Sequence, residues 1–161
     1  MRGGARITWS PPLALLLAFA CTGEPESAIS VHPTAEVTIG IHRIQVEVAD
    51  TPDRMSRGLS GRSRLAEGRG MVFPYARAER HGFWMLEMQF DIDIVWIRDD
   101  RIVDVTSRAP HEPAGDLAVY RPREPADLVL EVPAGTAERL SWKIGDPVTV
   151  DPPIGPRRPA E

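Results

Sequence analysis

The sequence predicts a mainly β fold, a single small sandwich or partly closed barrel with one or two short helices. Two observations predict it. First, several short segments alternate apolar and polar residues with the two-residue period of a strand, and turn residues separate them. Second, only two short segments carry the start and stop residues of a helix. The chain of 161 residues, of which 42% are hydrophobic and 26% charged, suits one soluble globular domain.

The N-terminal segment has the features of an export signal. Arg2 and Arg6 precede an apolar run over residues 13–20, which ends in the small-x-small pattern Ala18-Phe19-Ala20. The run is far shorter than the roughly 20 apolar residues of a membrane-spanning helix. We therefore expect residues 1–20 to be a signal peptide and the protein to leave the cytoplasm.

The single cysteine, Cys21, directly follows this segment. The sequence Leu17-Ala18-Phe19-Ala20-Cys21 resembles a bacterial lipobox, in which lipid is attached to the cysteine thiol. A lone cysteine cannot form an internal disulfide, and a free thiol is unusual in an oxidising compartment. We expect a lipoprotein anchored to a membrane of the cell envelope through Cys21; the alternative is a soluble periplasmic or secreted protein. Residues 21–35 have few large apolar side chains and predict a flexible tether.

The folded domain is expected to span residues 36–150. It begins with a hairpin, because residues 36–39 and 44–48 both alternate apolar and polar side chains. Thr51-Pro52-Asp53 is a helix start, with threonine as the N-cap and proline at the first helical position. We expect this short helix to stop at Gly61.

The middle of the chain contains short strands rich in aromatic residues. Residues 71–73 are expected to form a strand that Pro74 ends, and residues 75–82 a charged loop. Residues 92–97 and 102–106 form the clearest hairpin in the sequence. Because large aromatic side chains bury extensive apolar area, we expect this part of the chain to form the core.

The C-terminal third contains a long proline-rich segment. Residues 107–127 predict a loop, and long ordered loops are often functional. A strand is expected at residues 128–132, a short helix at 135–140 and a last strand at 148–150. Residues 151–161 are rich in proline and predict a disordered tail.

A set of motifs in the domain resembles family 192 of the domains of unknown function. In chain order they are Arg57-Gly58-Leu59-Ser60-Gly61-Arg62, Gly70-Met71-Val72-Phe73, Phe83-Trp84-Met85, Asp93-Ile94, Leu130-Glu131-Val132-Pro133-Ala134-Gly135 and Gly145-Asp146. The resemblance covers about residues 37–150 and implies a small β-rich domain, often exported in bacteria, without an established activity. After F-W-M the family usually continues K-N-T and later P-L-D, whereas this chain has Glu87 in place of the Asn and Asp91 in place of the Pro.

Three acidic residues indicate a candidate binding site. Glu87, Asp91 and Asp93 are two or four residues apart, so they would share one face of an extended strand. Neighbouring carboxylates repel one another unless a cation such as Arg57, Arg62 or a metal ion lies between them. The alternative is that Glu87 and Asp91 are solvated and that Asp93 alone is paired, with Arg62.

Trp84 is either a core residue or, if it is exposed beside these acids, a ring that would stack on a sugar or on a cation of a partner. The candidate binding residues are therefore Arg62, Trp84, Glu87, Asp93 and, on the rim formed by the long loop, His111.

The sequence favours binding over catalysis. The four histidines lack the paired spacing of metal ligands, so we expect neither a metal nor a cofactor. Ser60 does not lie in a G-x-S-x-G nucleophile motif, and the formal net charge of −4 argues against a nucleic-acid partner. We expect a binding or interaction domain at the cell envelope whose partner, besides the membrane, is a small ligand or an envelope protein. One alternative is an envelope hydrolase with Glu87 or Asp93 as general base. Another is a purely structural domain, expected if Arg62 and Asp93 form a buried pair with no adjacent cavity.

Overall fold

The computed structural model describes residues 32–111 and 118–155. The predicted signal peptide, Cys21 and most of the tether lie outside these residues, as do parts of the proline-rich segment and of the tail. Within the described residues no helix is long and apolar enough to cross a membrane.

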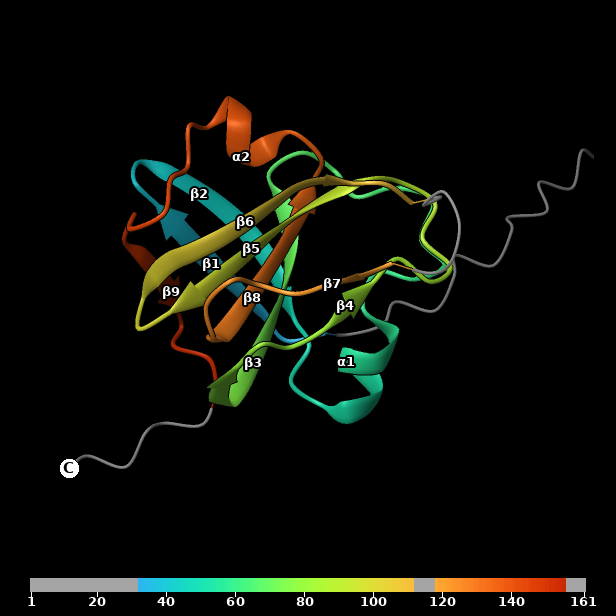
Figure 1. Ribbon diagram of the computed structural model, residues 1–161, viewed down its shortest axis with the longest axis horizontal. Helices are drawn as coiled ribbons and strands as arrows, with labels where there is room; N and C mark the ends of the chain where they lie inside the picture. Colours follow the sequence, from blue (N-terminus) through green and yellow to red (C-terminus); the bar gives the residue numbers. More distant parts are fainter. Residues whose placement is uncertain (1–31, 112–117, 156–161) are drawn as a thin grey trace, which may run out of the picture. The chain divides into compact units, whose positions relative to one another are not determined.

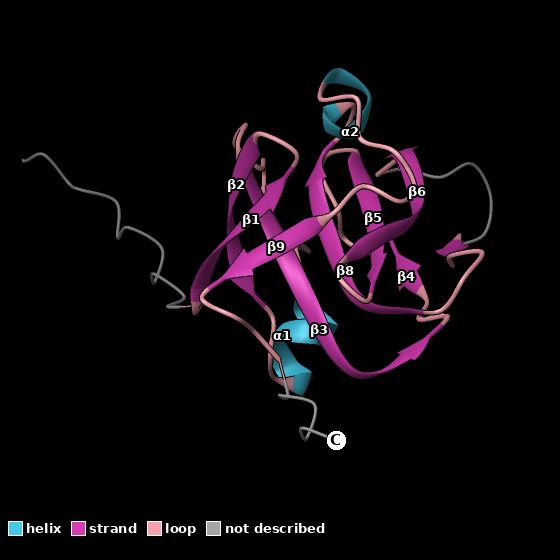
Figure 2. Cartoon of the chain, turned by 90° about the vertical axis from the view of Figure 1, so that its left-hand side faces the viewer, coloured by secondary structure: helices cyan, strands magenta, loops and turns pink. Residues whose placement is uncertain are grey.

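Seven strands form one curled sheet that resembles half of a barrel (Figures 1 and 2). They are β1 (Thr34–Ile39), β2 (His42–Val48), β3 (Arg69–Glu79), β5 (Ile92–Arg98), β6 (Arg101–Ala109), β8 (Ala126–Pro133) and β9 (Val148–Asp151). Their order in the sheet is β6-β5-β8-β3-β2-β1-β9, and only the β2–β3 pair is parallel. The predicted mainly β fold is confirmed.

Two short strands and two short helices complete the described part of the chain. A separate two-stranded sheet pairs β4 (Phe83–Trp84) with β7 (Val119–Tyr120). The two helices are α1 (Pro52–Arg57) and α2 (Thr136–Arg139). In Figure 1, α2 lies over one end of the large sheet, and α1 lies near β4 at the other end.

The two edge strands of the large sheet approach each other at one point. Arg101, at the start of β6, forms an isolated bridge with Pro147, just before β9. The Ile102 amide donates to the Asp146 carbonyl at 3.1 Å, and the Val148 amide donates to the Asp100 carbonyl at 2.9 Å. These bonds cover part of each edge, which otherwise exposes unpaired backbone groups.

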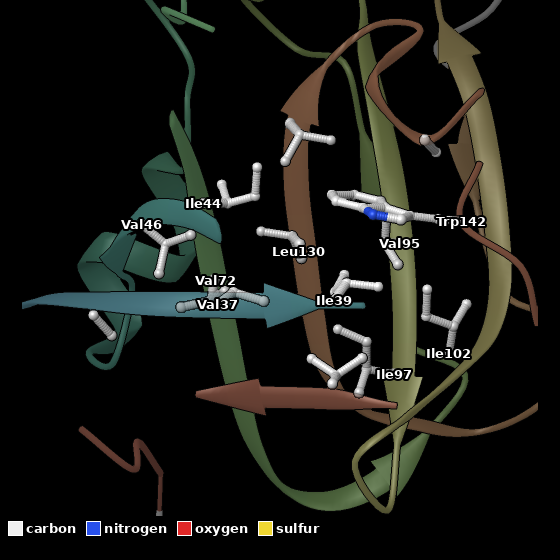
Figure 3. Close-up of a cluster of buried hydrophobic side chains, with 14 of the residues drawn as sticks. Val37, Ile39, Ile44, Val46, Val72, Val95, Ile97, Ile102, Leu130 and Trp142 are labelled. Atoms are coloured by element: carbon white, nitrogen blue, oxygen red, sulfur yellow. The ribbon is translucent and has the colours of Figure 1, made fainter. Parts of the chain in front are cut away.

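One apolar cluster fills the inside of the curl (Figure 3). Side chains from opposite strands, such as Val37, Ile44, Val95 and Leu130, point toward one another there. Trp142, which follows α2, lies beside Val95 and extends this cluster toward the helix.

A second apolar cluster lies on the other face of the same central strands. Phe83 of β4 meets Phe73 of β3 edge to face, with ring centroids 5.0 Å apart, and meets Trp96 of β5 at 5.4 Å. All six residues from Ile92 to Ile97 are buried, because β5 is covered on both faces. A strand buried on both faces shows no alternation of polar and apolar residues.

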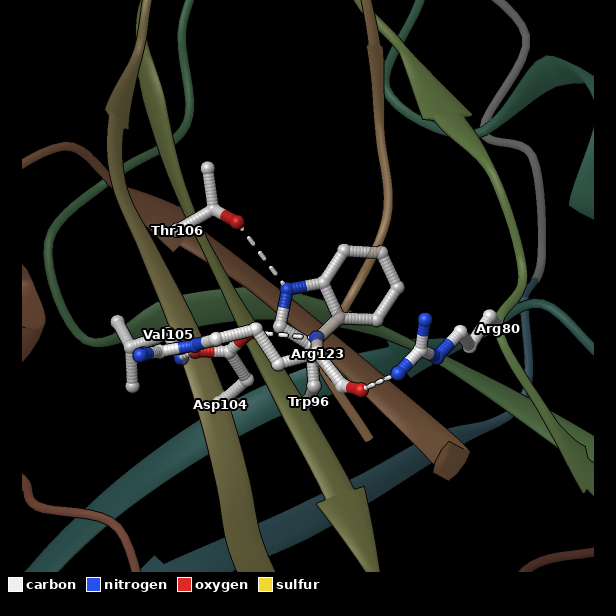
Figure 4. Close-up of polar contacts among 6 residues, drawn as sticks. All are labelled: Arg80, Trp96, Asp104, Val105, Thr106 and Arg123. Atoms are coloured by element: carbon white, nitrogen blue, oxygen red, sulfur yellow. Dashed lines mark hydrogen bonds and ion pairs between the residues drawn. The ribbon is translucent and has the colours of Figure 1, made fainter. Parts of the chain in front are cut away.

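A polar network links β6 to the segment that enters β8 (Figure 4). Asp104 on β6 accepts bonds from the backbone amide and the guanidinium of Arg123, the shortest at 2.8 Å. The Arg123 carbonyl in turn accepts a bond from the guanidinium of Arg80. Burial raises the pKa of Asp104, but its bonds from Arg123 and Val105 outweigh that effect and lower it. Part of the predicted proline-rich loop is therefore fixed to the sheet.

Three predicted boundaries are wrong. Pro74 does not end β3, which continues to Glu79. The reason is that β2 pairs with β3 only as far as Val72, so β3 has an open side at Pro74, and proline is tolerated on an open side of a strand. The first helix ends at Arg57 rather than near Gly61, because Gly58 already has a φ of +50°. The segment expected to be a loop over residues 107–127 contains the end of β6, all of β7 and the start of β8.

Candidate binding pocket

Glu131 on β8 is a carboxyl group placed among apolar side chains. Its neighbours Leu130 and Val132 point into the curl, so Glu131 points to the opposite face, as Val129 does. There it lies opposite Met71 of β3 and Ile94 of β5. Only 6% of its surface is exposed.

The Glu131 carboxyl group lacks the partners that buried polar groups usually have. Its Oε2 atom is buried and has no hydrogen-bond partner among the described residues. Burial raises the pKa of Glu131 to about 8, while the charge of Arg62 acts in the opposite direction. The carboxyl group is therefore mostly protonated at neutral pH.

An open cavity of about 80 Å³ leads to Glu131, and we call it the Glu131 pocket. Apolar and aromatic residues from α1, the segment after it, β3 and the β4 region form much of its wall: Met55, Leu59, Phe73, Phe83, Trp84 and Met88. Arg57, Ser60 and Tyr75 add polar groups. The pocket thus has an acid and several aromatic rings within one small space.

The wall of the pocket is held by the segment that follows α1. The Thr51 side chain caps α1 by accepting a bond from the Arg54 amide at 3.3 Å. The Ser60 hydroxyl donates to the Leu86 carbonyl at 2.8 Å, and the Gly61 amide donates to the Glu87 carbonyl at 2.9 Å. These bonds join the wall after α1 to the turn after β4.

Two aromatic residues of the pocket, Trp84 and Tyr75, differ in their exposure and contacts. Trp84 is 51% exposed and presents an indole ring to solvent. Tyr75 is half-buried, and burial, together with the charge of Glu131, raises its pKa to about 12. The Tyr75 ring stacks on His81 with centroids 3.5 Å apart and an interplanar angle of 12°. Tyr75 is therefore a neutral hydroxyl at neutral pH.

Arg62 is paired with Glu47. Its guanidinium donates to the two Glu47 carboxylate oxygens at 2.5 and 2.8 Å. This pairing raises the pKa of Arg62 and lowers that of Glu47. The alternative expectation that Arg62 pairs with Asp93 is wrong, because Glu47 on β2 occupies the guanidinium.

Asp93 is fully buried and accepts three backbone hydrogen bonds. Oδ1 accepts from the amides of Arg108 and Gly135 at 2.8 and 2.9 Å, and Oδ2 accepts from Ala137 at 2.8 Å. This carboxylate joins β5, β6 and the start of α2. Its oxygens face the backbone rather than a ligand-accessible space.

Glu87, Asp91 and Asp93 do not share a face, so that prediction is wrong. Glu87 lies in a turn with a φ of +57°, and the chain from Met85 to Asp91 is not a strand. Asp91 is exposed, and its Oδ1 is 2.6 Å from Nδ1 of His111, whose hydrogen bonds lower the pKa of Asp91.

Of the five predicted binding residues, only Trp84 lines the Glu131 pocket. Arg62 affects Glu131 through its charge, while Glu87, Asp93 and His111 lie elsewhere. Sequence reasoning missed Glu131; the available signal was an acid inside the otherwise apolar run 128–132. No group of three or more potential metal ligands occurs among the described residues.

A family model described as "Uncharacterized ACR" matches residues 35–150. The chain belongs to family 192 of the domains of unknown function. A UPF0127 protein from Thermococcus gammatolerans is 31% identical over 107 residues, which are 66% of this chain and 66% of that relative. The match therefore spans slightly less than two thirds of the relative's length. These findings confirm the family resemblance.

Two solved structures share the fold of this family 192 domain. A candidate transcription regulator from Sinorhizobium meliloti 1021 is 28% identical and superimposes with a TM-score of 0.68, covering 74% of this chain and 95% of that one. A protein of unknown function from Novosphingobium aromaticivorans DSM 12444 is 29% identical with a TM-score of 0.69, covering 76% and 89%.

Residues from four of the family 192 motifs meet at the Glu131 pocket. The R-G-L-S-G-R motif supplies residues 57–60, G-M-V-F supplies Phe73, F-W-M supplies Phe83 and Trp84, and L-E-V-P-A-G supplies Glu131. Motifs that are far apart in the sequence thus surround one cavity.

Proposed function

We propose that the protein is an exported, lipid-anchored domain of the cell envelope that binds a small ligand in the Glu131 pocket. Export and anchoring are supported by the signal-like segment 1–20 and by the lipobox-like sequence before Cys21. Two or more acyl chains on the N-terminal cysteine would hold the domain stably at a membrane.

One observation carries the binding proposal: the buried Glu131 carboxyl group lines an open pocket, and its Oε2 has no partner among the described residues. Burying a polar group without a hydrogen bond lowers stability, so such a group needs an explanation. A ligand that interacts with the Glu131 carboxyl group in this pocket would offset that cost, and an exposed Trp84 at the same cavity gives that ligand a ring to contact.

A thermal-shift screen of the full chain, solubilised in detergent, tests the binding proposal. The screen compares envelope sugars, peptides, amines and carboxylates on the wild type, on Glu131→Gln and on Glu124→Gln, whose side chain is exposed and outside the pocket. We expect at least one class of compound to stabilise the wild type and Glu124→Gln but not Glu131→Gln. Hits that stabilise all three proteins equally would contradict binding at Glu131.

Membrane fractionation tests the anchor. Cys21→Ser removes the thiol that would carry lipid, so we expect the variant to move from the membrane fraction to the soluble fraction. Thr22→Ser, a substitution at the next position that keeps the cysteine, is the matched control and should stay in the membrane fraction. Retention of Cys21→Ser in the membrane would refute lipid anchoring.

An envelope hydrolase that uses Glu87 or Asp93 as base has less support. Both oxygens of Asp93 accept backbone bonds, and Glu87 is not among the residues that line the Glu131 pocket. In that pocket, the Ser60 hydroxyl donates to a backbone carbonyl instead of to a base. A nucleophile needs an adjacent base, so we favour binding over catalysis.

A further inference from the structure

We propose that the ligand of the Glu131 pocket is a primary amine on a short alkyl chain, whose ammonium group pairs with the Glu131 carboxylate. This inference rests on the proposed binding function and names the chemical class of its ligand. Three observations carry it: the size of the pocket, the nature of its walls and the absence of a counter-ion for Glu131 among the described residues.

The volume of the pocket limits the size of the ligand group that can enter it. A water molecule needs roughly 10–15 Å³ of such space, so a cavity of about 80 Å³ holds a few waters or the end of one chain. A whole sugar ring or drug-sized molecule requires a pocket of several hundred Å³. The group that reaches Glu131 is therefore about the size of a lysine side-chain end.

The walls suit an alkyl chain with a cation at its tip. Met55, Phe73 and Phe83 offer apolar contact for methylene groups. Trp84 contributes an aromatic ring, and the negative face of such a ring attracts cations. Apolar walls that also include an acid are complementary to an aliphatic ammonium ion.

Glu131 lacks a counter-ion within the described part of the chain because the cation that acts on it is already paired. Arg62 makes two bonds to Glu47 and reaches Glu131 only through its charge. Among the residues that line the pocket, the other charged or titratable groups are Tyr75, which stays neutral, and Arg57, which is exposed at the end of α1. At its border, His81 stacks on Tyr75 and the Arg121 guanidinium lies beside the lining residue Gly82. An ammonium group that displaces water from the pocket would bring a positive charge next to the Glu131 carboxyl group.

Binding of an amine has a consequence that binding of a neutral ligand lacks. The free protein holds Glu131 mostly protonated at pH 7, whereas the bound ammonium favours the carboxylate. The O–H bond of Glu131 then breaks, its proton passes to the buffer, and the amine keeps all of its own protons. Close to one proton is released for each amine bound at pH 7, and no atom is oxidised or reduced.

Calorimetric titration of the full chain in detergent tests the inference at pH 7. The probes are n-propylamine, n-butylamine and n-pentylamine, with n-butanol and butyrate as neutral and anionic controls of matched length. Measurements in two buffers with different heats of ionisation give the number of protons released. We expect n-butylamine to bind at least tenfold more tightly than n-butanol, with release of close to one proton.

Variants locate the site of binding. Glu131→Gln keeps the shape of the side chain and should weaken n-butylamine binding at least tenfold and abolish proton release. Trp84→Ala should weaken it about two- to fivefold through loss of the ring contact. Glu124→Gln should match the wild type, and circular dichroism verifies that each variant is folded.

Two results would overturn the inference. If n-butanol or another neutral compound binds as tightly as n-butylamine and depends on Glu131, the ligand is a hydrogen-bonding neutral molecule and the proposed binding function still stands. If none of the amines binds, or if Glu131→Gln binds them as the wild type does, the ammonium site is refuted. The thermal-shift screen then decides separately whether the pocket binds any ligand.

Discussion

Glu131 is a buried acid whose Oε2 atom has no hydrogen-bond partner among the described residues. Most buried carboxyl groups are paired or accept several hydrogen bonds, as Asp93 does with three backbone amides in the same domain. Glu131 instead lies on β8 opposite Met71 and Ile94, where it is desolvated. The comparison shows that a buried carboxyl group stabilises the fold where backbone amides donate hydrogen bonds to it, as they do to Asp93.

The pH dependence of stability gives a test of the state of Glu131. Its pKa is about 8 in the folded protein and near 4.5 in an unfolded chain, so the folded state binds more protons between these pH values. The contribution of Glu131 to the free energy of unfolding therefore falls as pH rises from 5 to 8, by up to about 1.4 kcal/mol per pH unit. We expect Glu131→Gln to lack this contribution and to be more stable than the wild type at pH 8.

Urea unfolding at pH 5, 6, 7 and 8 measures the effect, with Glu124→Gln as the matched control. Glu47, whose pKa is lowered by Arg62, loses its stabilising contribution only as pH falls below about 4.5, outside this range. The difference between Glu131→Gln and wild type therefore isolates Glu131. Parallel pH profiles for the two proteins would show that Glu131 is ionised in the folded state.

At the scale of elements, one carboxylate holds three parts of the chain together. Asp93 on β5 accepts bonds from Arg108 on β6 and from Gly135 and Ala137 at the start of α2. In Asp93→Asn, the oxygen retained by Asn keeps some of these bonds, but the new amide meets a backbone N–H that has no acceptor. We expect the free energy of unfolding to fall by about 1–3 kcal/mol.

Urea unfolding of Asp93→Asn, with Asp91→Asn as the exposed control, measures this loss. Asp91 is only two residues away and interacts with His111 at the surface, so its substitution should change stability far less. Equal effects of the two substitutions would mean that the buried bonds of Asp93 contribute nothing specific.

The elements were predictable where one face of a strand meets solvent or where a turn has clear residues. The hairpin β1–β2 and the cap at Thr51 follow from alternation and capping chemistry, and the hairpin β5–β6 follows from two apolar runs that a short polar turn separates. The prediction that Pro74 ends the strand was wrong because the effect of a proline depends on whether another strand pairs with it on its N–H side. The sequence alone does not show which strand lies there.

The candidate site was less predictable than the fold. Glu131 is the one acid in the apolar run 128–132, and it is buried because the α1 segment and β4 cover that face of the sheet. Glu87 and Asp91 would align in an extended chain, but the turn after β4 separates them. Long-range packing therefore decided the first outcome, and a local turn decided the second.

At the scale of the whole domain, the central strands separate two apolar clusters, one on each face of the sheet. The cluster inside the curl is apolar and is closed in part by the bonds between the β6 and β9 edges. The cluster on the other face contains the Glu131 pocket and is covered by short elements, α1 and the β4–β7 pair. The Glu131 pocket therefore lies beside the short elements, so the proposed ligand would reach it without opening the main interior.

The first strand of the folded domain begins before residue 36. β1 begins at Thr34, two residues before the expected domain start, and its Ala35 is buried opposite Val46. The Pro33 carbonyl also accepts a bond from Val48 at 2.7 Å. A fragment of residues 36–155 should therefore have a free energy of unfolding about 1–3 kcal/mol below that of residues 32–155, because it lacks these bonds and this burial. Urea unfolding of the two fragments at equal concentration measures the difference, and coincident transitions would show that the first strand contributes to stability only from Glu36 onward.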